Sequence, residues 1–144
     1  MRRIRGERGA ALVEAAVTIP LLLLIAVAIF DFGRAYQTWQ VLTNAAREGA
    51  RYSVTPGATV AQTQTIVRDY MRNGALPAAD VAAATVGVNQ GVMLPSGSAS
   101  QITISYPFQF MFLQPVARLV KGGGPTPGGP LTMFVGATMR NESP

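Results

Sequence analysis

The residue types that most often carry out chemistry are scarce in this 144-residue sequence, which has no histidine and no cysteine. The usual general base, the thiolate nucleophile and the commonest nitrogen ligand for metals are therefore missing, and the serines have no histidine to activate them. The acidic residues outside the apolar N-terminal part mostly stand beside arginines, a pattern that favours surface ion pairs; they are Asp31, Glu48, Asp69, Asp80 and Glu142. The sequence predicts no enzyme, no cofactor and no metal site.

One carboxylate stands apart from these, because Glu14 is the single charge in the apolar stretch of residues 10–30. A carboxylate in such a stretch lowers its desolvation cost by meeting a cation. The alternative is that Glu14, which is close to the basic end of the stretch, extends its side chain to the lipid headgroups. Both interpretations remain open at this point.

The apolar stretch itself predicts a membrane-spanning helix. Its 21 residues would rise roughly 30 Å, about the thickness of the hydrocarbon layer. Ten large apolar side chains contribute roughly −3 to −6 kcal/mol to insertion, against roughly 2.5 kcal/mol or more for a central carboxylate. They are Val17, Ile19, Leu21, Leu22, Leu23, Leu24, Ile25, Val27, Ile29 and Phe30. Insertion is therefore favoured.

Charge around this stretch predicts its orientation. Four arginines and one glutamate precede it in residues 1–9, while Asp31 follows it, so the leader is expected in the cytoplasm and the rest of the chain outside. A secretory signal peptide cleaved at Ala28 is the alternative, but the apolar run is long for one and the helical pattern continues past that point. The leader carries much of the net charge of +5, and no basic face with aromatic residues follows it, so we expect no nucleic acid partner.

Helical periodicity continues beyond the membrane stretch and predicts one helix from Ala10 to about Val54. Its apolar stripe would consist of Trp39, Leu42, Ala46 and Ala50, and Thr55, Pro56 and Gly57 would end it. Pro20 removes one backbone hydrogen bond and favours a kink, either as a tolerated irregularity or as a bend used in assembly.

The stretch "RGERGAALVEA" resembles the processing signal of type IV pilin-like proteins, with a basic leader, a glycine at the cleavage point and a glutamate at the fifth position of the mature chain. Residues 8–53 closely resemble the TadE-like family, which carries a glutamate and a proline in the apolar segment, a glycine–arginine pair after it and an "AAREGAR" stretch. The matching residues are Glu14, Pro20, Gly33, Arg34, Ala45, Ala46, Arg47, Glu48, Gly49, Ala50 and Arg51.

The resemblance implies a minor pilin or pseudopilin of a Tad-type (tight adherence, Flp) pilus. It implies that a prepilin peptidase cleaves between Gly9 and Ala10, and that Glu14 sets the register between subunits by meeting a neighbour's new N-terminus. Its partners would be the peptidase, other pilin or pseudopilin subunits and the pilus assembly platform, at the bacterial cytoplasmic (inner) membrane or in the pilus. The alternative is an uncleaved, membrane-anchored accessory protein that recruits envelope partners. Ala15 departs from the pattern of many pilins, which have an aromatic residue after the glutamate.

The remaining chain predicts a small α+β domain, so that the whole divides into a leader (1–9), a transmembrane helix (10–30) and an extracytoplasmic domain (31–144). We expect a helix at Val60–Asn73, strands at 81–89, 101–106 and Leu131–Met139, and a turn region at 90–100. The segment "FQFMFLQPVARLV" could extend a strand or begin a helix ending at Lys121. We expect its aromatic residues in the core rather than in an exposed patch. The segment "KGGGPTPGGP" predicts a loop.

Overall fold

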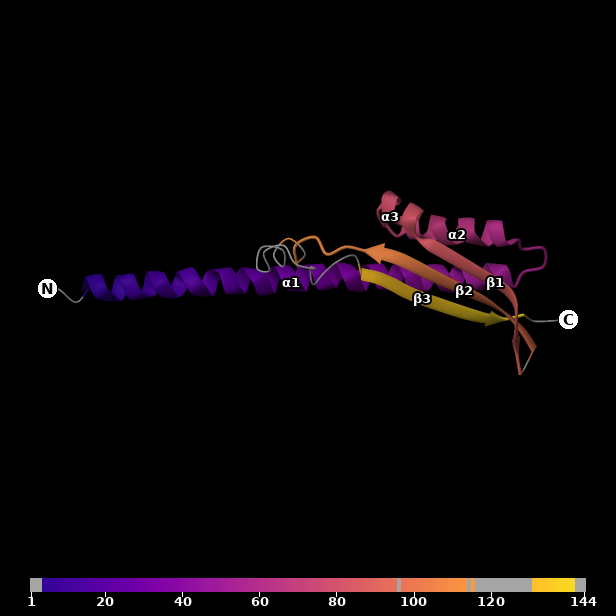
Figure 1. Ribbon diagram of the computed structural model, residues 1–144, viewed down its shortest axis with the longest axis horizontal. Coiled ribbons are helices and arrows are strands. Elements are labelled where there is room, and N and C mark those ends of the chain that lie inside the picture. Colours follow the sequence, from indigo (N-terminus) through magenta and orange to yellow (C-terminus); the bar gives the residue numbers. More distant parts are fainter. Residues whose placement is uncertain (1–3, 96, 114, 116–130, 142–144) are drawn as a thin grey trace.

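The computed structural model describes residues 4–95, 97–113, 115 and 131–141, and it shows an α+β protein of pilin-like layout (Figure 1). The elements in chain order are α1 (Ile4–Ser53), α2 (Val60–Asn73), α3 (Ala78–Ala83), β1 (Thr85–Leu94), β2 (Gly97–Phe108) and β3 (Leu131–Arg140). The three strands form one antiparallel sheet in the order β1-β2-β3. The predicted fold class is confirmed.

The long helix α1 dominates the shape of the molecule, with one half projecting away from all other elements (Figure 1). Its 50 residues correspond to roughly 75 Å. It begins at Ile4 rather than at the expected Ala10, because Arg5, Glu7 and Arg8 have high helix propensity and the helix continues through the two poor helix formers Gly6 and Gly9. The C-terminal end agrees with the prediction, and Gly57 turns the chain with a positive φ of 82°.

Helix α2 has the predicted bounds and a capping box at its start. The side chain of Thr59 accepts a hydrogen bond from the backbone of Gln62 (3.3 Å), and the Gln62 side chain accepts one from the backbone of Thr59 (3.1 Å). Gly74 ends the helix against α1, where a Cβ would lie 2.5 Å from Cγ1 of Val41. The two helices therefore approach closely.

Two sequence-based expectations about the next elements are wrong. Residues 81–83, expected in a strand, belong to α3, because Pro77 precedes this short run of alanines and Asp80 lies in its first turn. The expected turn region 90–100 is mostly strand: β1 and β2 pair as far as Leu94 and Gly97. The irregularity between Gln90 and Val92 is a bulge at Gly91, which has a φ of 98°. Pairing between β1 and β2 continues beyond this bulge.

The core lies between one face of the sheet and the three helices. Alternate residues of β2 point into it, namely Ile102, Ile104, Tyr106 and Phe108, each at most 3% exposed. From α1 the core receives Leu42 and the small residues Ala45, Ala46 and Ala50. The burial expected for Leu42, Ala46 and Ala50 is confirmed, but that of Trp39 is wrong: Trp39 is 46% exposed, and its neighbour Thr38 is buried in its place.

The aromatic segment after β2 is only partly core, which corrects the expectation for it. Phe108 ends β2 and is buried and Phe110 is half-buried, but Phe112 is 42% exposed. Three further predictions lie largely or wholly outside the described residues. They are the alternative helix ending at Lys121, the glycine-rich loop of 121–130 and the surface ion pair of Glu142.

Candidate functional site at the membrane-proximal end of the domain

The residues expected to direct processing all lie on the projecting half of α1. Gly9, Ala10 and Glu14 are exposed, and the helix runs through them without a break. The backbone carbonyl of Glu14 accepts a hydrogen bond from Thr18 Oγ1 at 2.7 Å. The three ion pairs formed within the described part of the chain do not include the Glu14 carboxylate.

Pro20 lies in the same exposed half, and α1 continues through it. Together with Leu23, Leu24 and Val27 it lines a shallow apolar groove on the helix surface. Among the described residues α1 is the one helix that is long and apolar enough to cross a membrane, and none of its most apolar window is buried in the structure. This surface needs an apolar environment.

Where the domain begins, Asp31 is completely buried and binds a segment 80 residues away in the sequence. Its Oδ2 accepts hydrogen bonds from the backbone N–H groups of Phe112 and Leu113, both at 2.9 Å, and its Oδ1 accepts one from Met111 at 3.2 Å. Burial acts to raise the pKa of Asp31, but the three N–H groups and the nearby Arg34 together hold this pKa below its ordinary value. The ionised carboxylate thus fixes the aromatic segment to the helix.

Aromatic contacts reinforce this attachment on both sides of Asp31. The rings of Phe30 and Phe112 meet edge to face with centroids 5.9 Å apart, and those of Phe32 and Phe110 do so at 5.8 Å. Because Phe30 and Phe32 lie on either side of Asp31 in the sequence of α1, the segment contacts the helix through both rings as well as through the carboxylate. Its Phe112 ring reaches the last turns of the apolar stretch.

The glycine–arginine pair follows directly, and its two members have different surroundings. Arg34 Nη1 lies 3.5 Å from Asp31 Oδ1, and its guanidinium lies 5.6 Å from the centre of the Phe108 ring. Arg34 therefore joins the helix to the end of β2. Gly33 is exposed, and a Cβ there would meet nothing within 4 Å, so packing inside the described chain does not require a glycine.

The "AAREGAR" stretch lies where α1 packs most closely against the domain. Ala45, Ala46, Gly49 and Ala50 are buried, whereas Arg47 and Arg51 are exposed. At Gly49 a Cβ would lie 2.4 Å from Cγ2 of the fully buried Val67 on α2. The charged members act locally: Glu48 and Arg51 form an ion pair at 2.9 Å across one helical turn. The stretch is thus a close-packing surface with a solvated outer side.

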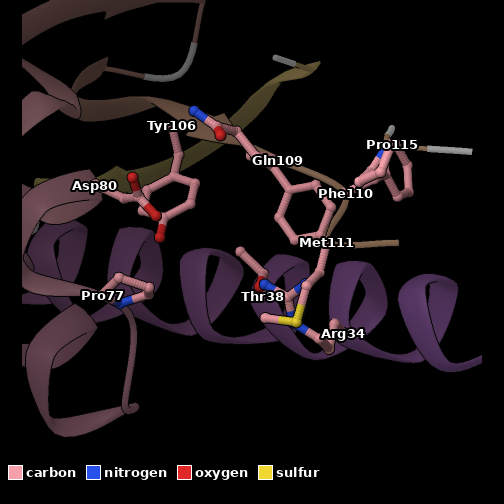
Figure 2. Close-up of a pocket in the computed structure, with 10 residues that line it drawn as sticks. Arg34, Thr38, Pro77, Asp80, Tyr106, Gln109, Phe110, Met111 and Pro115 are labelled. Atoms are coloured by element: carbon pink, nitrogen blue, oxygen red, sulfur yellow. The ribbon is translucent and has the colours of Figure 1, made fainter. Parts of the chain in front are cut away.

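A cavity of about 350 Å³ adjoins Arg34, between α1, α3 and the end of β2 (Figure 2). Tyr106 and Asp80 meet on its wall (Figure 2). Burial, the Asp80 charge and a hydrogen bond to Asp80 raise the pKa of Tyr106 to about 12. This phenol therefore stays neutral at physiological pH. Within the described ranges no group of three or more acidic, histidine or cysteine residues is placed to hold a metal ion.

The fold and this site define a class: an α+β domain of pilin-like layout on a long N-terminal helix with a bare apolar half. A family model described as TadE-like protein matches residues 9–51, which confirms the resemblance seen in the sequence for this segment and supports a Tad pilus-associated role. No curated protein and no solved structure matches the chain.

The functional residue that the sequence did not reveal is Asp31. The sequence predicts a surface ion pair for Asp31. Its ion pair with Arg34 is present, but Asp31 is buried and also binds a distant segment of the chain. The available signals were its position directly after an apolar run and the uncharged, aromatic segment far along the chain. Nothing in the sequence linked the two. The surface ion pairs expected for Glu48 and Asp69 are confirmed, with Arg51 and Arg72 as partners.

Proposed function

We propose that this chain is a pilin-like minor subunit or assembly factor of a Tad/Flp-type pilus, and that it acts by subunit packing rather than by catalysis. The observation that carries the proposal is α1 itself. The TadE-like match covers residues 9–51 of this helix, whose first half is bare and apolar while its second half holds the domain. An element built in this way can stay in the membrane or exchange lipid for the helices of neighbouring subunits.

In this proposal a prepilin peptidase removes residues 1–9 and leaves Ala10 as the mature N-terminus. The basic leader, the position of Gly9 and the glutamate five residues later support it. Gly9 is exposed on the helix and a Cβ there would meet nothing within 4 Å, so no contact within the described chain explains this glycine. A peptidase that must approach the backbone provides a reason for a residue without a side chain.

Glu14 then pairs with the new amine of a neighbouring subunit and sets the register between helices. Its carboxylate is exposed on the apolar half of α1, where an unpaired charge is unfavourable in lipid. Within its own mature chain, the amine at Ala10 lies along the helix backbone and has no side chain with which to reach Glu14. A partner's terminus has no such restriction.

The outward face of α1 offers the packing surface for this neighbour. Its exposed large residues are spaced alternately three and four apart, as in a heptad pattern, and continue from the membrane stretch into the domain. They are Leu22, Ile25, Ile29, Phe32, Tyr36 and Trp39. Each of these side chains is at least 46% exposed, so the stripe is open to a second α1, although the Phe32 ring also touches Phe110 of the domain.

We further propose a single-pass arrangement in the bacterial cytoplasmic membrane, with the leader in the cytoplasm and residues 31–144 outside. Mass spectrometry of the membrane-derived protein tests the processing step. A chain that begins at Ala10 supports the pilin assignment, and a chain that begins at Met1 or Arg2 supports the uncleaved accessory protein. A terminus near Phe30 would indicate a secreted protein.

A second experiment tests assembly. The chain has no cysteine, so a single introduced one reports on contacts between copies. We expect Ile25→Cys to form disulfide-linked dimers in membranes or sheared pili, and Glu14→Ala to reduce them. Thr103→Cys, exposed on the outer face of the sheet, is the matched control that should not crosslink. If Glu14→Ala leaves cleavage, crosslinking and filament incorporation unchanged, the register role is wrong.

A further inference from the structure

We infer that the segment Phe110–Leu113 is a second membrane contact, which seats the domain on the outer leaflet at the boundary between headgroups and acyl chains. This inference rests on the proposed membrane-spanning role of α1, and it assigns the lipid surface as the partner of the exposed side chains of this segment.

The exposed apolar surface of this segment is continuous with the helix surface expected in lipid. Phe112 lines a shallow groove of about 310 Å³ together with Leu23, Ala26, Val27 and Phe30 of α1. Leu23 and Phe30 are seven residues apart, or roughly 10 Å along the helix, which is comparable with the roughly 5–10 Å depth of interfacial side chains. If the first half of α1 lies in lipid, Phe112 lies at its outer edge.

Exposure within the segment is concentrated in apolar side chains. Met111 is 55% exposed and Phe112 is 42% exposed, and no charged residue occurs between Pro107 and Leu113. Among the described residues, Arg34 places a cation beside Asp31 and the Phe108 ring, three residues beyond Asp31 and therefore roughly 4.5 Å farther from the apolar stretch. Apolar side chains followed by an arginine fit the boundary between acyl chains and phosphate groups.

Three backbone N–H groups of the segment are hydrogen-bonded within the protein, as the edge of the hydrocarbon layer requires. A loop at the edge of the hydrocarbon normally leaves N–H groups without water, which costs several kcal/mol for each group. Here three consecutive N–H groups, those of Met111, Phe112 and Leu113, donate to the single Asp31 carboxylate. Because these donors are satisfied internally, the segment can enter the interface without losing hydrogen bonds to water.

Tryptophan fluorescence of the full chain in lipid vesicles tests this inference. The single native tryptophan is removed by Trp39→Phe, and one new tryptophan is introduced at a time. Phe112→Trp and Met111→Trp report on the segment, and Leu22→Trp reports on the membrane span. Phe134→Trp is the matched control, since Phe134 is 76% exposed on the outer face of the sheet. The quenchers are phospholipids brominated either near the headgroup, for positions 111 and 112, or deep in the acyl chain, for position 22, and, from the aqueous side, acrylamide.

We expect brominated lipid to cause a clear loss of emission from tryptophan at 112 and 111, and acrylamide to act mainly on the control at 134. Adding Asp31→Ala should reverse the pattern at 112. Quenching at 22 without quenching at 112 or 111 overturns the inference but leaves the membrane span intact. Loss of lipid quenching at 22 as well overturns both. Protection of 112 from both quenchers means that a second protein chain covers the segment, which also overturns it.

Discussion

Asp31 carries the most specific prediction, because its one side chain accepts hydrogen bonds from three consecutive backbone N–H groups of the segment Phe110–Leu113. Replacing it by alanine leaves three backbone N–H groups without their acceptor and removes the ion pair with Arg34. Each unsatisfied buried donor costs about 1–3 kcal/mol, which sets the upper limit. The segment can open and meet water, so we expect a smaller total of about 2–4 kcal/mol, expressed as local opening.

Hydrogen exchange measures this opening directly. A change of about 2–4 kcal/mol corresponds to amide exchange about 30- to 1,000-fold faster at Met111, Phe112 and Leu113. Mass spectrometry of the full chain in detergent or nanodiscs should detect it, while the amides of β2 keep their protection. Asp31→Asn keeps one acceptor oxygen and should have an intermediate effect.

Glu48→Ala is the matched control for this experiment. It removes another carboxylate of the same helix, but one whose ion pair with Arg51 is exposed and local. We expect no change of exchange at 111–113 in this variant. Unchanged exchange at these amides in a folded Asp31→Ala protein would refute the assignment of Asp31 as the group that holds the segment.

Three further predictions concern acid, close packing and alkali. Because the pKa of Asp31 is lowered by folding, its stabilising effect is complete above about pH 3.8 and is lost as the pH falls through the lower folded-state pKa. Tryptophan at 112 should therefore become accessible to acrylamide in acid. Asp31→Asn should abolish this transition. Gly49→Ala would place a Cβ 2.4 Å from Val67 Cγ2 and should destabilise the domain by about 1–3 kcal/mol, as measured by pulse proteolysis. Gly33→Ala, with open space around the new Cβ, should stabilise α1 by up to about 1 kcal/mol. Equal effects of the two substitutions would contradict the packing argument. The raised pKa of Tyr106 means that stability present below pH 10 is lost as the pH rises towards about 12, and absorbance titration should show a late phenolate step that Tyr106→Phe removes.

Much of the architecture follows from local patterns in the sequence. The apolar stretch, the continuing helical periodicity and the Thr55-Pro56-Gly57 stop predict α1, and the apolar spacing with the stop at Gly74 predicts α2 with its observed bounds. These features depend on residues close together in the chain, where helix propensity and capping decide the outcome. The alternation in β2 and β3 is of the same kind.

Tertiary packing decided which face of α1 is buried and what Asp31 does. The helical spacing predicts the burial of Leu42, Ala46 and Ala50 correctly, but only the close approach of α2 and the sheet shows that Ala45 and Gly49 are buried and Trp39 is exposed. The short helix α3 replaced part of a predicted strand, because alternation over a few alanines is a weak signal. Asp31 receives its three donors from residues 80 positions away, and only the folded chain brings a carboxylate and distant backbone N–H groups together.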